Sequence, residues 1–159
     1  MAALNIGDKA PHFCLPDYQN HEHCLDKYSG RWVAVYFYPR DNTPGCTTEA
    51  CEFSERYEAL DQLDCTVIGI SPDSAKSHGK FIDKFILKHI LLCDENHETI
   101  SAYGQWVVKK MYGKEIEGVN RSTFLINPEG KIAYIWNKVK AQGHAEEVKQ
   151  KLSELKKTL

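Results

Sequence analysis

Two stretches of consecutive apolar residues stand out in the hydrophobic pattern of this chain. They are residues 32–38 (Trp-Val-Ala-Val-Tyr-Phe-Tyr) and residues 66–70 (Thr-Val-Ile-Gly-Ile). Neighbouring side chains of a strand point to opposite faces, so a run that is apolar at successive positions is typical of a strand covered on both faces. The pattern therefore predicts two central strands of a sheet with other layers on both sides.

Two hairpins are predicted toward the ends of the chain. Near the N-terminus, residues 13–15 and 21–25 are short strand candidates separated by a polar loop. Toward the C-terminus, residues 122–126 and 131–136 flank the turn sequence Asn-Pro-Glu-Gly at 127–130. Strand-like runs joined by a turn of this composition are typical of β-hairpins.

Helix signals lie between these strands. Thr43 followed by Pro44 favours a helix start, with threonine as the N-cap and proline as the first helical residue, and we expect this helix to run to about Leu60. A second helix, capped by residues 71–73, carries several aromatic and apolar side chains. A third helix has its apolar residues on one face. The apolar residues of these two helices are Phe81, Phe85 and Ile86, and Val148, Leu152, Leu155 and Leu159.

The order of the predicted elements indicates an α/β fold. The two central strands are joined through a helix and should be parallel, whereas the final hairpin must be antiparallel, so the central sheet is mixed and flanked by helices. This is the thioredoxin-like arrangement with an added N-terminal β-hairpin. No linker rich in proline, glycine or serine interrupts the sequence, and we expect residues 1–159 to form a single domain.

Composition and charge exclude several classes of protein. Hydrophobic residues make up 42% of the chain and charged residues 26%, which is typical of a globular protein. The net charge is −2 and no basic segment exceeds two residues, so we expect no nucleic-acid partner. The longest apolar run is far shorter than the ~20 residues that cross a bilayer. Asp8 precedes any apolar stretch, which argues against a signal peptide and for a cytoplasmic location.

The cysteines are scattered at positions 14, 24, 46, 51, 65 and 93. Their density is below that of a secreted disulfide scaffold, and a reducing cytosol favours free thiols. Cys14, Cys65 and Cys93 fall in or beside predicted strands and are interpreted as structural residues. Cys46 and Cys51 remain as candidates for chemistry.

Cys46 is predicted to be the third residue of the helix that begins at Pro44. The first N–H groups of a helix have no partner within the helix and favour an anion, such as a thiolate. A helix end typically contributes ~0.3–1 kcal/mol, whereas keeping a cysteine mostly ionised at neutral pH requires roughly 2.7 kcal/mol. A further donor or cation is therefore required. The hydroxyl of Thr43 is a candidate donor, and a remote arginine would complete the site.

Cys51 follows Cys46 by five residues. On an α-helix the two residues are about 140° apart around the axis, and their Cα atoms are separated by roughly 8.7 Å. Disulfides need Cα atoms within ~7 Å, so the pair can form a bond only if the first turns of the helix unwind. The spacing is also not C-x-x-C, which disfavours an ordinary dithiol oxidoreductase.

The residues Pro39, Thr43 and Cys46 match the signature P-x-x-x-[T/S]-x-x-C, and the chain resembles the peroxiredoxins. The sequence Thr-Pro-Gly-Cys-Thr, with Cys51 five residues after Cys46, is similar to the subfamily called bacterioferritin comigratory protein or peroxiredoxin Q. The resemblance covers nearly the whole chain. It includes residues 7–11, 35–39, 69–71 and 120–126.

The resemblance implies a role for each matching residue. Cys46 would be the peroxidatic cysteine and Cys51 the resolving one. Thr43 would hydrogen-bond the peroxide, Pro39 would shield the sulfur, and Arg121 would steady the thiolate. Glu49 also matches the subfamily and would support the loop. Cys93 is an alternative resolving cysteine.

The implied function is a thiol peroxidase that reduces hydrogen peroxide and organic hydroperoxides. A sulfenic acid on Cys46 would condense with Cys51 to an intramolecular disulfide, and thioredoxin or a similar dithiol would restore both thiols. No haem, flavin or metal is required, and the subfamily is often monomeric. Two other classes remain open: a thioredoxin-fold disulfide oxidoreductase, and a non-catalytic binding or chaperone module. Peroxide consumption with dithiothreitol would distinguish a peroxidase from a binding module.

The sequence His-Glu-His-Cys at 21–24 superficially resembles a metal site. His21 and His23 would share one face of a strand, but a structural zinc site takes four ligands from more than one segment. No second pair with ligand spacing is present, so we expect no metal. Asp8, His12 and the pair Glu146-Glu147 are interpreted as solvated surface residues.

Overall fold

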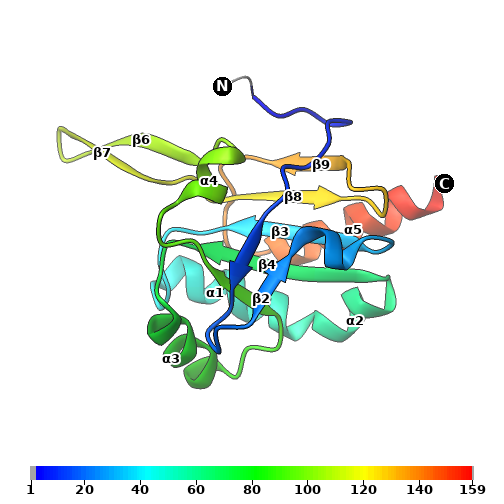
Figure 1. The fold of residues 1–159 in the computed structure, drawn as a ribbon, viewed down its shortest axis with the longest axis horizontal. Coiled ribbons are helices and arrows are strands. Elements are labelled where there is room, and N and C mark those ends of the chain that lie inside the picture. Colours follow the sequence, from blue (N-terminus) through cyan, green and yellow to red (C-terminus); the bar gives the residue numbers. More distant parts are fainter. Residues whose placement is uncertain (1–2, 159) are drawn as a thin grey trace.

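The computed structural model describes residues 3–158 and is built around a five-stranded mixed sheet (Figure 1). Its strand order is β5-β4-β3-β8-β9, with β3 parallel to β4 and antiparallel to β8. The outer pairs are β4–β5, which is parallel, and β8–β9, which is antiparallel. The predicted thioredoxin-like α/β fold is confirmed. The strands are β3 (Trp32–Phe37), β4 (Cys65–Ser71), β5 (Ile90–Cys93), β8 (Ser122–Ile126) and β9 (Ile132–Trp136).

The sheet separates two hydrophobic cores, and β3 contributes to both of them. Ala34 and Tyr36 pack on one side with the helices, whereas Val33, Val35 and Phe37 face the other side. The helical side consists of α1, α2, α3 and α5, and the opposite side is covered by the N-terminal segment and the short helix α4 (Figure 1). The helices are α1 (Pro44–Glu55), α2 (Tyr57–Gln62), α3 (Ala75–Phe85), α4 (Glu98–Ala102) and α5 (His144–Lys157).

The predicted N-terminal hairpin is present as β1 (Cys14–Pro16) and β2 (Glu22–Cys24), followed by the 3₁₀ helix η1 (Leu25–Tyr28). The expectation that all six cysteines are free thiols is wrong for this hairpin, because Cys14 and Cys24 form a disulfide. The interpretation of Cys14 as a structural residue of a strand did not include a partner. The register of the hairpin, which places the two residues opposite each other, supplies one.

The first helix is shorter than predicted. It ends at Glu55, and Arg56 adopts φ −98° and ψ 9° before α2 begins at Tyr57. The side chain of Arg56 donates from Nε to Glu146 on α5 at 3.0 Å. This ion pair joins the break to α5, and Glu146 stays a surface residue with 39% of its side chain exposed.

The second helix begins later than residues 71–73 predicted. Ser71 ends β4, and its hydroxyl donates to Asp73 at 2.7 Å. Ser74 is the N-cap instead, and its hydroxyl accepts the N–H of Ser77. Ile86 lies just beyond the helix with a positive φ of 53°. The predicted end of the last helix, Leu159, lies outside the described residues.

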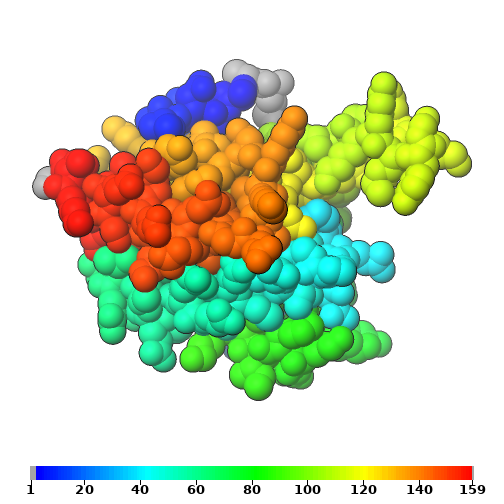
Figure 2. All heavy atoms as spheres, turned by 180° about the vertical axis from the view of Figure 1, so that it is seen from behind, coloured from blue at the N-terminus to red at the C-terminus, as the bar shows by residue number. Residues whose placement is uncertain are grey.

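A further hairpin was absent from the sequence prediction. It consists of β6 (Trp106–Met111) and β7 (Lys114–Val119) and projects from the body of the molecule (Figures 1 and 2). Tyr112 at its tip is 98% exposed and Val108 is 62% exposed. Because apolar and charged residues are mixed on this arm, it has no simple alternation that would reveal a half-buried strand.

Between residues 3 and 158, no helix combines the length and the apolar character needed to cross a membrane.

Candidate active site

The candidate site begins where β3 ends. The chain leaves the sheet after Phe37, turns through residues 38–43, and enters α1 at Pro44. Thr43 has an extended backbone, and its carbonyl accepts the N–H of Thr47 at 2.8 Å, so its prediction as the N-cap is confirmed. Its hydroxyl does not cap the helix but donates to the carbonyl of Arg40 at 3.0 Å. Pro39 lies half-buried at the start of this loop.

Cys46 is the third residue of α1, as predicted, and only 1% of it is exposed. It is a free thiol, and Arg121 Nη2 donates to its sulfur at 3.2 Å. Antiparallel pairing of Phe37 with Ser122 explains this contact, because it places Arg121, the residue before β8, next to the end of β3. The arginine that the resemblance implied is therefore brought to the sulfur by sheet register.

Arg121 also holds a buried carboxylate. Its Nη1 donates to Glu49 Oε1 at 2.8 Å, and Glu49 is fully buried one turn after Cys46 on α1. Burial raises the pKa of Glu49 to about 7, although the charge and the hydrogen bond of Arg121 act in the opposite direction. Within the described part of the chain, Glu49 Oε2 has no hydrogen-bond partner. The arginine therefore divides its donors between a carboxyl group and the cysteine sulfur.

Gly45 makes room for this arrangement. A Cβ atom at this position would lie 3.1 Å from Arg121 Nη2, which is closer than almost all real Cβ contacts. The glycine of Thr-Pro-Gly-Cys therefore lets the guanidinium lie against the first turn of α1. The need for space beside Arg121 therefore explains the glycine of this motif.

A buried network anchors the loop before α1 to α3. Asp41 accepts hydrogen bonds from Tyr38 and Ser77 and pairs with His78 Nδ1 at 2.6 Å. Burial alone would lower the pKa of His78, but its bonds to Asp41 and other partners raise that pKa to about 10. The imidazole is thus positively charged beside Asp41. Sequence reasoning missed this network; an aspartate inside the turn of residues 39–43 was the only local signal for it.

Two other features near Arg121 were also missed. Lys109 of β6 donates to the carbonyl of Val119, and burial together with the charge of Arg121 lowers its pKa. Asn120 pairs with Gln105 through both its backbone and its side chain, at 2.8 Å in each case. These contacts fix the chain on the N-terminal side of Arg121. They span 10 and 15 positions across the β6–β7 hairpin, which the sequence analysis did not predict.

Cys51 is half-buried on the same helix, and its side chain packs against the core on the helical side of the sheet. Its sulfur is a free thiol, and burial followed by the charge of Glu55 raises its pKa. A shallow pocket of about 270 Å³ between Cys51 and Phe85 leaves this thiol within reach of solvent. Cys93, the alternative resolving residue, is buried at the end of β5.

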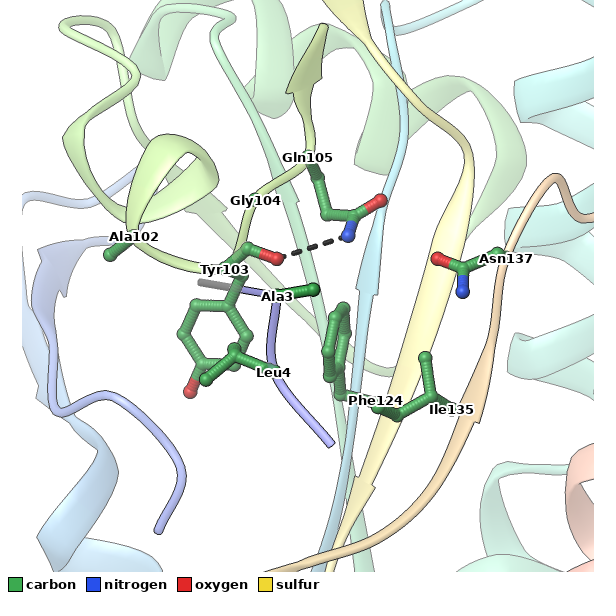
Figure 3. Close-up of a pocket in the computed structure, with 9 residues that line it drawn as sticks. All are labelled: Ala3, Leu4, Ala102, Tyr103, Gly104, Gln105, Phe124, Ile135 and Asn137. Atoms are coloured by element: carbon green, nitrogen blue, oxygen red, sulfur yellow. Dashed lines mark hydrogen bonds between the residues drawn. The ribbon is translucent and has the colours of Figure 1, made fainter. Parts of the chain in front are cut away.

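The apolar cavity in Figure 3 is separate from this site. It has a volume of about 280 Å³ and is lined by Leu4, Tyr103, Phe124 and Ile135, which belong to the core on the other side of the sheet from Cys46. Gln105 also borders the cavity and donates to the carbonyl of Tyr103.

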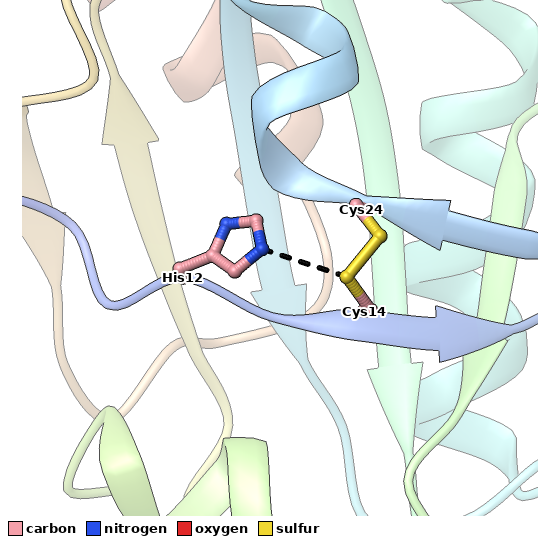
Figure 4. Close-up of side chains that lie close together, drawn as sticks. All are labelled: His12, Cys14 and Cys24. Carbon is pink, nitrogen blue, oxygen red and sulfur yellow. Dashed lines mark hydrogen bonds between the residues drawn. A yellow bond between two sulfur atoms is a disulfide. The ribbon is translucent and has the colours of Figure 1, made fainter.

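Two clusters of side chains in the described residues have spacing suitable for a metal ion. One contains Asp41, Asp73 and His78, which are already engaged in the buried network. The other contains His12 with the two disulfide-bonded cysteines (Figure 4). The predicted pairing of His21 with His23 on one face forms no such cluster, because His23 bonds to Asp17 and Tyr28.

The sequence of the chain is similar to a known protein family and to named relatives. Residues 6–135 match the AhpC/TSA family. Peroxiredoxin Bcp of Bacillus subtilis (strain 168) is 44% identical over 152 residues, which cover 96% of this chain and 97% of that protein. Peroxiredoxin Bcp of Escherichia coli (strain K12) is 37% identical over 154 residues, covering 97% and 99%.

Solved structures agree with the sequence relatives. A mutant of PrxQ from Xylella fastidiosa superposes with a TM-score of 0.92 at 38% identity, covering 97% of this chain and 98% of that one. Peroxiredoxin Q of Xanthomonas campestris superposes with a TM-score of 0.86 at 37% identity, covering 89% and 90%. Relatives of both kinds are peroxiredoxins, which supports a thiol peroxidase over the two alternative classes. The chain therefore belongs to the AhpC/TSA family and is a thiol peroxidase related to peroxiredoxin Q and Bcp.

Proposed function

We propose that the chain reduces hydrogen peroxide and organic hydroperoxides through the thiolate of Cys46. The observation that carries this proposal is the 3.2 Å hydrogen bond from Arg121 Nη2 to Cys46 Sγ at the start of α1. The thiolate attacks the distal oxygen of the hydroperoxide, so that an S–O bond forms as the O–O bond breaks. The products are water or an alcohol and a sulfenic acid on Cys46.

Three residues assist this step in our proposal. Arg121 stabilises the thiolate and then the charge that develops on the peroxide oxygens, because preorganised donors act strongly in a site that excludes water. The hydroxyl of Thr43, which donates to the carbonyl of Arg40 in the structure, hydrogen-bonds the bound peroxide. Pro39 shields the sulfur from bulk water. Glu49 positions Arg121 through its 2.8 Å contact.

Cys51 is the resolving cysteine in this proposal. Its thiol condenses with the sulfenic acid on Cys46, which forms a disulfide and releases water. Both residues lie in the continuous helix α1, so its first turns must unwind before the sulfurs can bond. Cys93 is the competing candidate for this role.

A dithiol reductant then restores both thiols by exchange, and we propose that this reductant is thioredoxin. We place the chain in the cytoplasm as a monomer, with residues 1–159 acting as a single domain. The chemistry takes place on cysteine sulfur alone and requires no haem, flavin or metal.

The first prediction tests the nucleophile. Cys46→Ser should lose peroxide turnover with dithiothreitol as the reductant, because only the sulfur of Cys46 combines the helix N-terminus with Arg121. Cys65→Ser is the matched control and should retain turnover, since Cys65 is buried on β4 and burial raises its pKa to about 12. Substantial turnover by a folded Cys46→Ser protein would refute the assignment.

A further inference from the structure

The N-terminal hairpin carries a second pair of cysteines that the peroxidase chemistry does not use. Cys14 on β1 and Cys24 on β2 are directly paired in the antiparallel register, with their Cα atoms 4.0 Å apart, and are joined as a disulfide (Figure 4). Cys14 is exposed and Cys24 is half-buried. This pair lies on the side of the sheet opposite to Cys46 and Cys51 (Figure 1).

The two sulfurs have different neighbours. His12 Nε2 lies 3.5 Å from Cys14 Sγ, and Glu22 Oε1 lies 3.7 Å from Cys24 Sγ. Each neighbour is two residues before its cysteine. A proton on His12 Nε2 stabilises negative charge on Cys14, whereas the carboxylate of Glu22 opposes negative charge on Cys24. When the disulfide is cleaved, Cys14 is therefore the better leaving group.

The hairpin is held together by contacts other than the disulfide. Asp17 accepts the backbone N–H groups of Gln19 and His21 through Oδ1, and its Oδ2 lies 2.9 Å from His23 Nε2. The other ring nitrogen of His23 lies 2.7 Å from the hydroxyl of Tyr28. These contacts preserve the strand register when the disulfide is open, so the two thiols stay adjacent and can form the bond again without unfolding.

We propose that Cys14 and Cys24 form a second thiol–disulfide site that exchanges with dithiol partners independently of the peroxide site. Although Cys14 is the more exposed sulfur, the better leaving group sets the direction of attack: a thiolate of the partner attacks Cys24 Sγ, which forms a mixed disulfide and expels Cys14 as a thiolate beside His12. The second thiol of the partner then attacks the partner's own sulfur in the mixed disulfide and releases Cys24. The net exchange turns one disulfide and one dithiol into two hairpin thiols and one oxidised partner, and the reverse exchange closes the hairpin.

The test follows each cysteine separately. The full-length protein is oxidised with the thiol oxidant diamide, reduced with dithiothreitol for increasing times, alkylated, and mapped by peptide mass. Cys14 and Cys24 should become alkylated together as reduction proceeds. With brief exposure to glutathione, a monothiol, the trapped mixed disulfide should lie on Cys24. The proposal is overturned if the pair stays open after oxidation, if it resists dithiothreitol, or if glutathione is found on Cys14.

A matched pair of variants tests the asymmetry. His12→Leu should slow the opening of the hairpin disulfide by roughly five- to tenfold, because leucine has no donor to offer a charged sulfur. His21→Leu, an exposed change on the same hairpin with no contact to either sulfur, should leave the rate unchanged. Equal rates in the two variants would contradict the role of His12. The mapping of the unaltered protein tests the site itself, whatever the stability of either variant.

Discussion

At the scale of single residues, Arg121 joins the two buried groups of the candidate site. Its two terminal nitrogens bond to Glu49 and Cys46, which are one helical turn apart on α1, while Gly45 leaves space for the guanidinium. A change in Glu49 or Cys46 therefore alters the hydrogen bond that Arg121 donates to the other residue. Two predictions at the residue scale concern Arg121 and its partner Glu49.

Arg121→Ala should slow the oxidation of Cys46 by about 10²-fold or more, because it removes the charged donor that faces the sulfur. Thr43→Val should slow the same step if its hydroxyl binds the peroxide. Stopped-flow measurement of the first oxidation step, with a single peroxide addition and no reductant, isolates it from recycling. Arg56→Ala is the control, since Arg56 pairs with Glu146 instead. An oxidation rate in Arg121→Ala equal to that of the control would remove arginine from the mechanism.

Glu49→Gln should change how stability depends on pH. Burial raises the pKa of the folded Glu49 from 4.5 to about 7, so the unfolded chain releases this proton first and stability falls as pH rises from about 4.5 to about 7. At about 1.4 kcal/mol per pKa unit, the loss is about 3 kcal/mol. Urea unfolding at pH 5 and pH 8 should show this loss in the unaltered protein but not in Glu49→Gln. The exposed Glu55→Gln serves as the control, and an identical pH profile in all three proteins would contradict the prediction.

At the scale of elements, the two proposed steps require different conformations of α1. The intact first turn holds Cys46 against Arg121. The disulfide between Cys46 and Cys51 can form only after that turn opens. Gly45, the second residue of the helix, is a weak helix former, and Thr47 and Thr48 are β-branched. Opening is therefore easier here than in an alanine-rich helix.

Oxidation with peroxide should lower the amide protection of residues 44–56, because the Cys46–Cys51 disulfide cannot form on the intact helix. Hydrogen exchange followed by mass spectrometry, with peptide mapping of the bond, measures both events. Cys51→Ser should keep its protection after oxidation. A bond from Cys46 to Cys93 or to a second chain would refute the prediction, as would a Cys46–Cys51 bond with unchanged protection.

The loop before α1 depends on α3 through the Asp41–His78 pair. His78→Gln should destabilise the protein by about 3–5 kcal/mol, because it leaves a buried carboxylate without its charged partner. Because the pKa of His78 is raised to about 10, the stabilisation from its ion pair with Asp41 is fully present below pH 6.5. This stabilisation is lost as the pH rises through about 10. Chemical denaturation at pH 6 and pH 9.5 should show the difference between His78→Gln and the control His21→Gln shrinking at the higher pH. A constant difference would contradict the ion pair.

The elements differ in how far local sequence could predict them. The uniformly apolar residues 32–37 and the Thr43-Pro44 start were correctly read, because strand burial and helix capping leave local signals. The β6–β7 hairpin was missed because most of its side chains are exposed or only half-buried and so show no clear hydrophobic alternation. The break at Arg56 was missed because no glycine or proline marks it in the local sequence.

At the scale of the whole molecule, long-range pairing decides what local sequence could not. Resemblance to peroxiredoxins pointed to Arg121, but only the register of Phe37 with Ser122 explains its position. Likewise, Cys14 and Cys24 could not be paired from spacing alone, because the register depends on the turn that Asp17 organises. The anchoring residue His78 bonds to Asp41 across 37 positions and had no local signal.

The central sheet also sets how the protein meets its reductants. Cys46 and Cys51 lie on the helical side of the sheet, and Cys14 and Cys24 lie on the opposite side. The layer of strands therefore separates the two cysteine pairs. If both pairs react as we propose, a reductant docked at one face cannot reach the sulfurs of the other, and full reduction requires two separate docking events that each deliver two electrons. One chain thus has two separate docking sites for electron donors, and either cysteine pair can be oxidised while the other is reduced.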